Sequence, residues 1–164
     1  MPKKPQNIGI CAGSFDPLTN GHINIIQRGL KIFDHIYVAI AINTQKQYLF
    51  SVKERLEMIK EVFKNEARVT VDAFEGLLVS YVKAKKARAI LRGLRTVQDF
   101  ESEFQISLAN KHLDASVDTI FMMTEDVYSH LSSSIIKEVI GFGGSGRGMV
   151  PPIVEKKLRD KLVR

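Results

Sequence analysis

A glycine-rich polar segment, AGSFDPLTNGH at residues 12–22, joins a short apolar run to a helical pattern. Gly13 lets a ligand approach the backbone closely, and Ser14 offers a hydroxyl beside it. His22 falls in the first turn of the following helix, where free N–H groups and the helix dipole favour an anion. A histidine at this place either only caps the helix or also donates a hydrogen bond to a phosphate oxygen. The segment therefore predicts an anion site with His22 as a candidate catalytic residue.

Three further polar segments follow apolar runs, and each carries groups that could bind phosphate or sugar. Arg92 and Arg95 lie within one turn, and arginine forks suit bidentate phosphate contacts, although two exposed arginines are often only solvated. Glu103 is a candidate for binding a ribose hydroxyl or an adenine amine, although acidic residues also suit a helix start. The segments are NTQKQYLF (43–50), RGLRTVQDFESE (92–103) and TEDVYSHLSSS (124–134).

None of the polar segments contains an obvious nucleophile–base pair, a carboxylate dyad or histidines and cysteines at metal-ligand spacing. The SHLSSS stretch is typical of a helix cap, or of hydroxyl and N–H groups that bind a nucleotide phosphate. The chain has many lysines, so Lys46 taken alone indicates no particular function and has to be interpreted with the residues around it. Together the segments predict an anion-binding crevice.

The rest of the sequence alternates β-rich runs with helical patterns, which predicts an α/β doubly wound parallel sheet of five strands with helices on both faces. In such a sheet, ligands bind beyond the carboxyl ends of the strands, so the polar segments are expected to meet at one edge. The expected strands are 7–12, 35–41, 68–74, 87–92 and 117–123. The expected helices are 21–33, 51–63, 77–86, 96–113, one that opens at 132–134 and a last one at 154–163.

Two of these helices carry further local signals. Ser51 and Glu54 have capping-box spacing, and the apolar residues of 96–113 (Val97, Phe100, Phe104 and Leu108) recur at the spacing of a core-facing helix.

The glycine-rich segment 141–152 lacks G-K-[S/T] and is predicted to be a mobile loop before the last helix. Residues 1–164 are expected to form a single domain.

Composition limits the class of protein and its partners. The longest apolar run, 36–42, is far shorter than the roughly 20 residues that span a bilayer, so no membrane association is expected. No signal peptide is predicted, and a single cysteine, Cys11, excludes an internal disulfide and favours the reducing cytoplasm. The 24 Lys and Arg against 18 Asp and Glu give a net charge of +6, which favours anionic partners without choosing among them.

The segments GSFDPLTNGH, RGLRTVQDFESE and SHLSSSIIKEV resemble the nucleotidyltransferases with a T/H-x-G-H signature. More narrowly, they resemble the bacterial phosphopantetheine adenylyltransferases of coenzyme A synthesis, and the resemblance extends over essentially the whole chain. It implies a Rossmann-like nucleotidyltransferase fold. It also implies transfer of an adenylyl group from ATP to 4′-phosphopantetheine, which gives dephospho-coenzyme A and pyrophosphate. A phosphate monoester is already a nucleophile, so a direct in-line displacement is expected, without a covalent intermediate.

The resemblance also assigns roles to residues at matched positions. His22 would stabilise the transition state, with Lys46, Ser14 and Arg95 as further catalytic candidates. The positions matched to phosphopantetheine are Ser14, Lys46, Leu78 and Arg92. Those matched to ATP are Ser14, Phe15, His22, Gly93, Leu94, Arg95, Glu103, Tyr128, Ser129, His130, Leu131, Ser132, Ser133 and Ser134.

The same resemblance implies Mg²⁺ that enters with ATP, a homohexamer, and coenzyme A as a feedback ligand. Three features depart from the family pattern. Cys11-Ala12 stands where tyrosine-proline is common, Ser14 replaces threonine as it does in many members, and 141–152 is richer in glycine than the family pattern.

Two alternative functions remain open from the sequence. The first is another nucleotidyltransferase of the superfamily, acting on nicotinamide mononucleotide or a polyol phosphate, which would share His22 but not the context of 92–103. The second is a basic nucleic-acid-binding module. That class interleaves aromatic and basic residues on one surface, whereas the aromatic residues here fall mostly at core spacings, so no nucleic-acid partner is expected.

Overall fold

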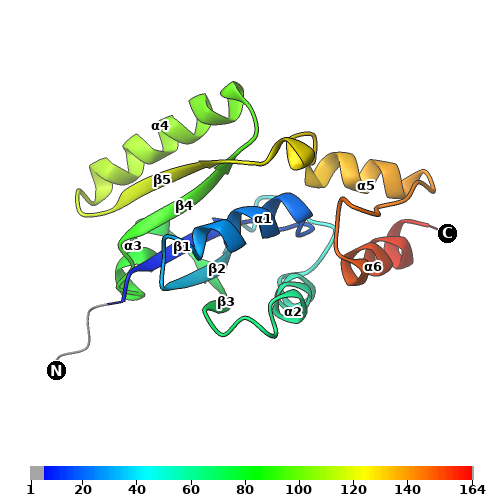
Figure 1. Cartoon of the computed structure of the whole chain (residues 1–164), viewed down its shortest axis with the longest axis horizontal. Coiled ribbons are helices and arrows are strands. Elements are labelled where there is room, and N and C mark those ends of the chain that lie inside the picture. The colour runs from blue at the N-terminus through cyan, green and yellow to red at the C-terminus, as the bar shows by residue number, and fades with distance from the viewer. Residues whose placement is uncertain (1–5, 164) are drawn as a thin grey trace.

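Five parallel strands form one sheet in the order β3-β2-β1-β4-β5 (Figure 1). The computed structural model describes residues 6–163. Each strand is parallel to its neighbours, and the register pairs Gly9 of β1 with both Ile36 of β2 and Ala89 of β4. The predicted α/β class and all five predicted strands are confirmed within two residues. The strands are β1 (Ile8–Gly13), β2 (His35–Ile42), β3 (Val69–Glu75), β4 (Ala89–Leu94) and β5 (Asp118–Met123).

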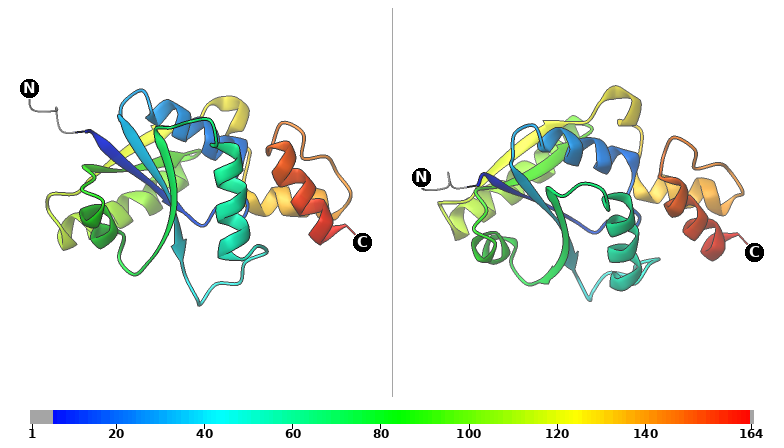
Figure 2. Two further views of the ribbon diagram at one scale, coloured as in Figure 1. Left: turned by 90° about the horizontal axis from the view of Figure 1, so that it is seen from below. Right: turned by 60° about the horizontal axis from the view of Figure 1, so that its bottom comes forward.

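Helices cover both faces of the sheet, as predicted (Figure 2). One apolar cluster packs α1 and α2 against one face, and a second packs α3 against the other. The first helix ends at Gly29, four residues before the predicted end, and the Ser51–Glu54 capping box is confirmed. The helices are α1 (Asn20–Gly29), α2 (Val52–Val62), α3 (Leu78–Ala84), α4 (Val97–Leu113), α5 (Ser133–Gly141) and α6 (Pro152–Leu162), with a short 3₁₀ turn η1 at Asp126–Tyr128.

Two glycines bring α1 unusually close to β4. A Cβ on Gly29 would lie 2.5 Å from Leu91, and a Cβ on Gly93 would lie 2.7 Å from Ile25. Contacts this short would force the facing side chains of Leu91 and Ile25 to shift. Gly93 therefore has a packing role here, whatever contact it makes with a ligand.

The chain turns to opposite sides of the sheet after β1 and after β4, because these adjacent strands lead to different neighbours. Such a switch point opens a crevice beyond the carboxyl ends of the two strands. The loops 14–19 and 95–96 leave the sheet at this place and connect β1 to α1 and β4 to α4. The fold thus positions two of the polar segments side by side.

Helices α5 and α6 lie beyond the carboxyl edge of the sheet, at the end opposite the first described residues (Figures 1 and 2). They share a third apolar cluster, in which Phe50 and Met58 pack with Leu131 and with residues of both helices. The predicted mobile loop 141–152 makes specific contacts here. The Gly146 N–H donates to Glu155 (2.9 Å), and the Met149 carbonyl accepts from Asn20 N–H (2.8 Å). The segment is therefore anchored to α6 and α1, rather than being a plain linker.

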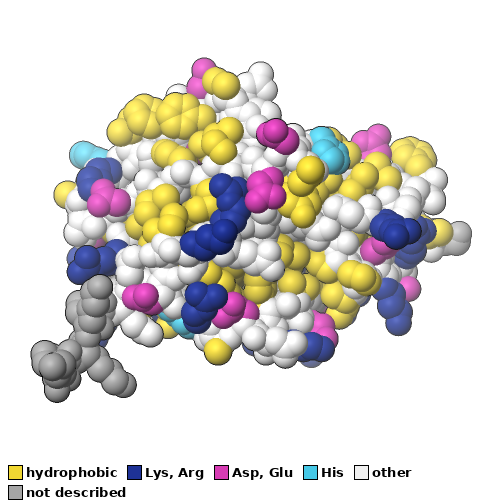
Figure 3. Space-filling model, in the orientation of Figure 1, with side chains coloured by type: hydrophobic (Ala, Val, Ile, Leu, Met, Phe, Trp, Pro, Cys, Tyr) yellow, Lys and Arg dark blue, Asp and Glu magenta, His cyan; other side chains and the backbone are white. Residues whose placement is uncertain are grey.

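The prediction that α4 faces the core with its apolar residues is wrong. No residue of α4 is buried, and Val97, Phe100, Phe104 and Leu108 are between 42 and 75% exposed. Figure 3 shows hydrophobic side chains gathered along the upper edge of the molecule, where α4 lies. The helical periodicity correctly identified an apolar face on α4, but it could not show whether that face is buried in the core or exposed.

No helix among the described residues is long and apolar enough to cross a membrane.

Candidate functional site

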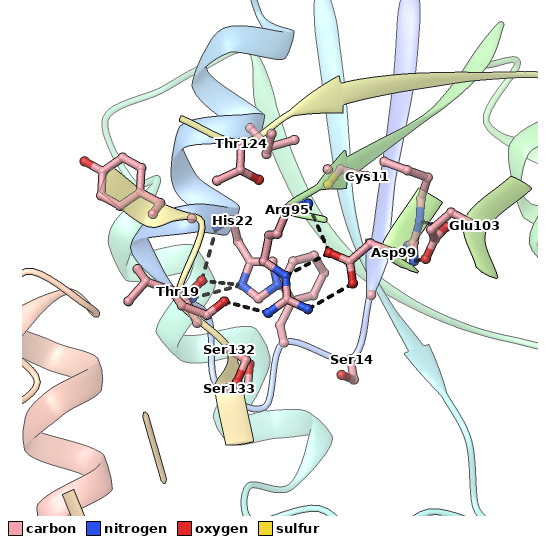
Figure 4. A pocket seen from close by; sticks show the side chains of 18 of the residues that line it. Cys11, Ser14, Thr19, His22, Arg95, Asp99, Glu103, Thr124, Ser132 and Ser133 are labelled. Carbon is pink, nitrogen blue, oxygen red and sulfur yellow. Dashed lines mark hydrogen bonds and ion pairs between the residues drawn. The ribbon is translucent and has the colours of Figure 1, made fainter. Parts of the chain in front are cut away.

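A cavity of about 350 Å³ occupies the crevice beyond β1 and β4 (Figure 4). Its walls come from the loop after β1, the start of α1, the end of β4, the start of α4 and the segment 124–133. The N-termini of α1 and α5 both contribute lining residues, namely His22 and Ser133. Free N–H groups at helix starts bind phosphate, so the cavity is suited to a polyanion.

His22 closes a capping box at the start of α1. Thr19 N–H donates to Nδ1 of His22 over 3.0 Å, and His22 N–H donates to the Thr19 hydroxyl over 3.3 Å. A backbone N–H can only donate, so Nδ1 is the unprotonated nitrogen and the proton of the neutral ring lies on Nε2. The capping interpretation of His22 is thus confirmed, while Nε2 keeps a proton that it can donate, and its hydrogen bond to a phosphate stays a prediction.

The surroundings of His22 keep its ring neutral. Burial, and then the positive charges of Arg92 and Arg95, lower the pKa of His22 from 6.5 to about 4. The ring also packs edge-on against Phe15, with 5.1 Å between the ring centroids. A neutral imidazole that donates from Nε2 can stabilise growing negative charge without giving up its proton.

Arg95 connects two walls of the cavity. Its guanidinium donates to the Asp99 carboxylate over 3.1 and 3.2 Å and to the carbonyl of Leu131 over 2.8 Å (Figure 4). Asp99 also accepts the N–H of Arg95. Asp99 is a site residue that sequence reasoning did not select, because an acidic residue in the first turn of a helix has an ordinary explanation.

A second cavity, of about 370 Å³, adjoins the first. Lys46 and Leu78 line it, together with Asn43 and Tyr48, which sequence reasoning missed. Both cavities share a set of lining residues that forms the boundary between them: Ala12, Gly13, Ser14, Arg92 and Glu103. The site therefore has two compartments that meet at the first polar loop and at the end of β4.

Arg92 and Glu103 form a bidentate ion pair at this boundary. Arg92 Nε donates to Glu103 over 2.7 Å, Nη2 donates to the other carboxylate oxygen, and Nη1 donates to the Ala12 carbonyl. Burial alone would lower the pKa of Arg92, but the hydrogen bond and the charge of Glu103 outweigh it and raise that pKa. The guanidinium is therefore charged and fixed in orientation.

Two buried charged residues, Asp16 and Arg55, hold the loops that form the site. The Asp16 carboxylate accepts the N–H groups of Leu49 and Phe50, each over 2.9 Å. Arg55, 2% exposed, donates to the carbonyl of Ser14 over 2.7 Å. An aspartate before a proline is typical of a turn and so indicates no such role for Asp16, and no sequence signal indicates the role of Arg55, because its partner Ser14 is distant in sequence.

Comparison with known proteins agrees with this geometry. The cytidylyltransferase-like family model matches residues 10–139. A phosphopantetheine adenylyltransferase of Desulfatibacillum aliphaticivorans is 54% identical over 157 residues, which cover 96% of this chain and 90% of that protein. The chain belongs to the phosphopantetheine adenylyltransferase family. This confirms the family predicted from the sequence, and it disfavours both the other nucleotidyltransferases and a nucleic-acid-binding module.

A solved structure has the same fold. It is a Vibrio parahaemolyticus protein assigned as a nicotinate-nucleotide adenylyltransferase, with a TM-score of 0.67 over 94% of this chain and 91% of that one. Sequence identity is only 14%, so the similarity extends to the fold alone. It confirms the Rossmann-like nucleotidyltransferase architecture.

Most residues that the family resemblance assigns to ATP or phosphopantetheine line one of the two cavities. Four do not: Leu94, Ser129, His130 and Ser134 line neither cavity. Leu94 is 3% exposed, and His130 and Ser134 are exposed. The residues in the first cavity are Ser14, Phe15, His22, Arg92, Gly93, Arg95, Glu103, Tyr128, Leu131, Ser132 and Ser133. Those in the second are Ser14, Lys46, Leu78, Arg92 and Glu103.

The cysteine that departs from the family pattern lines the first cavity but is not poised to react. Burial raises the pKa of Cys11 to about 11, although the charge of Arg92 partly opposes the rise. The thiol is therefore neutral near physiological pH, which fits the prediction that no covalent intermediate forms.

Proposed function

We propose that this protein transfers the adenylyl group of ATP to 4′-phosphopantetheine, giving dephospho-coenzyme A and pyrophosphate. The observation that carries the proposal is the pair of adjoining cavities with Ser14 and Arg92 on their shared boundary. A transfer between two phosphates needs two compartments whose anionic ends meet. The 54% identity to a phosphopantetheine adenylyltransferase supports this choice of substrates.

ATP is assigned to the first cavity and phosphopantetheine to the second. The two helix N-termini in the first cavity suit a triphosphate, and Arg95 adds a cation that Asp99 and Leu131 hold in place. The second cavity offers Lys46 for a phosphate and Leu78 for the apolar part of a pantetheine chain. Its different lining supports a different ligand.

The reaction proceeds as one in-line displacement at the α-phosphorus of ATP. An oxygen of the phosphopantetheine phosphate forms the new P–O bond while the bond to pyrophosphate breaks, and the electron pair leaves with pyrophosphate. His22 donates a hydrogen bond from Nε2 to an α-phosphate oxygen as charge grows. Lys46 and Arg92 offset the repulsion between the two phosphates. Catalysis therefore depends on aligning the two phosphates and on stabilising negative charge, and it requires no general base.

Mg²⁺ is proposed to enter as the counter-ion of ATP. No cluster of three metal-ligating side chains occurs within residues 6–163, and the carboxylates of Asp99 and Glu103 are engaged by arginines. Mg²⁺ is commonly held by substrate phosphates and water, so these residues fit a metal that arrives with the nucleotide. It would neutralise phosphate charge there.

Assembly as a homohexamer in the cytoplasm, with coenzyme A as a feedback ligand, is also proposed. The exposed apolar face of α4 supports association, since a lone domain rarely leaves two stacked phenylalanines, Phe100 and Phe104, in water. Coenzyme A shares its pantetheine arm with the proposed substrate and would compete for the second cavity.

Pyrophosphate release tests the proposed reaction. We expect the protein to release pyrophosphate from ATP in the presence of 4′-phosphopantetheine and not with nicotinamide mononucleotide. The reverse preference would contradict the proposal. ATP made chiral at the α-phosphorus should give inverted product, whereas retention would demand an adenylyl-enzyme.

A further inference from the structure

Tyr48 lines the second cavity and has no role in the reaction proposed above. Its ring lies over the guanidinium of Arg55, with 4.2 Å between Cζ and the ring centroid. Arg55 is buried, and its own hydrogen bonds to the carbonyls of Ser14 (2.7 Å) and Ser51 (3.4 Å) fix it in place. A cation attracts the face of an aromatic ring, so the ring of Tyr48 rests on a fixed support.

The hydroxyl of Tyr48 is available to a ligand. Within residues 6–163, no protein group forms a hydrogen bond with it, although the side chain is half-buried. Every fully buried polar side-chain atom in the same part of the chain has a partner, so this hydroxyl must be open to the cavity or to water. A phenol can donate a hydrogen bond, and a tyrosine has fewer rotatable bonds to restrain than a lysine. The hydroxyl is therefore a donor that is largely in place before a ligand binds.

The contacts of Arg55 place Tyr48 in the polar part of the second cavity. Through Arg55, the ring is linked to the backbone of Ser14, which lies on the boundary between the two cavities. Lys46, which is assigned to the attacking phosphate, lines the same cavity and lies two positions earlier in the same loop. Apolar lining comes from other elements, namely Phe74 of β3, Leu78 of α3 and Ile106 of α4. The phosphate end of a ligand in this cavity would therefore lie beside Tyr48, and its apolar arm would lie against other elements.

We propose that Tyr48 is a substrate-binding residue, whose hydroxyl donates a hydrogen bond to the phosphate of 4′-phosphopantetheine. Arg55 then acts as a positioning residue, because it holds the ring that carries this hydroxyl. Lys46 is exposed and must lose conformational freedom to bind, whereas the supported ring of Tyr48 loses little. The proposal rests on the proposed function, since it needs the phosphopantetheine phosphate to lie near Lys46 and Ser14.

Tyr48→Phe removes the hydroxyl and keeps a ring over Arg55. Pantetheine, which lacks the phosphate, is the second ligand, and competition experiments give the Kd of both ligands. We expect the Kd of 4′-phosphopantetheine to rise about tenfold, or about 1.4 kcal/mol, as for a lost hydrogen bond to a charged acceptor. The Kd of pantetheine should change less than about twofold. An unchanged Kd for 4′-phosphopantetheine, or an equal rise for both ligands, would overturn the proposal.

Two further variants control for general effects of the substitution. Tyr37→Phe removes the same hydroxyl from a half-buried tyrosine that lines neither cavity, and it should change neither Kd. A rise equal to that of Tyr48→Phe would overturn the proposal, because the effect would then not depend on the place of the hydroxyl. Tyr48→Leu removes both ring and hydroxyl, and it should weaken 4′-phosphopantetheine at least as much as Tyr48→Phe does. A smaller effect in Tyr48→Leu would also overturn the proposal.

The wild-type protein separates a failure of this proposal from a failure of the proposed function. If the wild type releases pyrophosphate with 4′-phosphopantetheine and Tyr48→Phe binds that ligand as tightly, only the role of Tyr48 fails. If the wild type releases no pyrophosphate with 4′-phosphopantetheine, it is the proposed function that fails, and the role of Tyr48 fails with it.

Discussion

The Asp16 carboxylate lies 3.3 Å from Nζ of Lys137 on α5, while it also accepts the two N–H groups of Leu49 and Phe50. One buried side chain thus joins the loop after β1, the loop after β2 and the helix behind the serine-rich segment. Nearby, the Ser133 hydroxyl donates to the carbonyl of Pro17 over 2.9 Å. The walls of both cavities are therefore tied together at a point outside the cavities themselves.

Replacing Asp16 should cost more stability than replacing Lys137. Asp16→Ala leaves the buried Phe50 N–H without an acceptor and removes two charge-assisted hydrogen bonds, so we expect a loss of about 2–4 kcal/mol in the free energy of unfolding. Lys137→Met removes only the ion pair, and the lysine is 31% exposed, so the loss should be about 1 kcal/mol or less. Urea unfolding measures both. An equal or larger loss for Lys137→Met would contradict the assigned role of Asp16.

Lys46→Ala should weaken phosphopantetheine use and leave ATP binding nearly unchanged. The side chain lines the second cavity only, so its charge is placed for the attacking phosphate. Steady-state kinetics for phosphopantetheine, with ATP affinity measured alone, separates the two effects. Lys46→Arg should rescue only in part, because a planar fork does not replace a compact ammonium. Lys53→Ala, which removes an exposed lysine outside both cavities, is the control. A matching loss of ATP affinity in Lys46→Ala would show that this loop does not serve the nucleophile.

Sequence patterns predicted the strands, the helices and the edge where the polar loops meet, because these depend on local periodicity and on the rules of parallel sheets. They missed contacts between distant segments. Arg55 donates a hydrogen bond to the carbonyl of Ser14, 41 positions away in the sequence, and no sequence feature near Arg55 indicates that partner. Glu103, which the sequence predicted as a site residue, lines both cavities, but the sequence could not reveal that Arg92 would hold both of its oxygens.

Disrupting the exposed face of α4 should break the proposed assembly. Phe104 is 44% exposed and stacks on Phe100, whose ring centroid lies 5.6 Å away. Phe104→Glu places a charge in that face and should lower the mass measured by light scattering from that of a hexamer. Gln105→Glu adds the same charge at a neighbouring exposed position and should leave the mass unchanged. A wild-type protein that is monomeric at micromolar concentration would contradict the assembly itself.

His22→Ala should slow turnover by about 10²–10³, because it removes a fixed donor to the charge that develops at the α-phosphate. ATP affinity should change much less, since the ground state needs this hydrogen bond less than the transition state does. Single-turnover kinetics with saturating substrates gives the effect on the chemical step. A folded variant with turnover near that of the wild type would remove His22 from the mechanism.

The depressed pKa of His22 should also make stability depend on pH. The folded pKa of about 4 lies below the ordinary 6.5, so between these values the unfolded chain binds more protons than the folded one. The stabilisation from a neutral His22 is therefore fully present above about pH 6.5 and is lost as pH falls towards 4.

His22→Gln keeps a side chain that can complete the capping box with Thr19 but cannot titrate in this range. Between about pH 7.5 and about pH 5, the wild type should lose about 2 kcal/mol more free energy of unfolding than this variant does. Urea unfolding at both pH values measures the difference, and equal losses in the two proteins would mean that His22 titrates normally in the folded state.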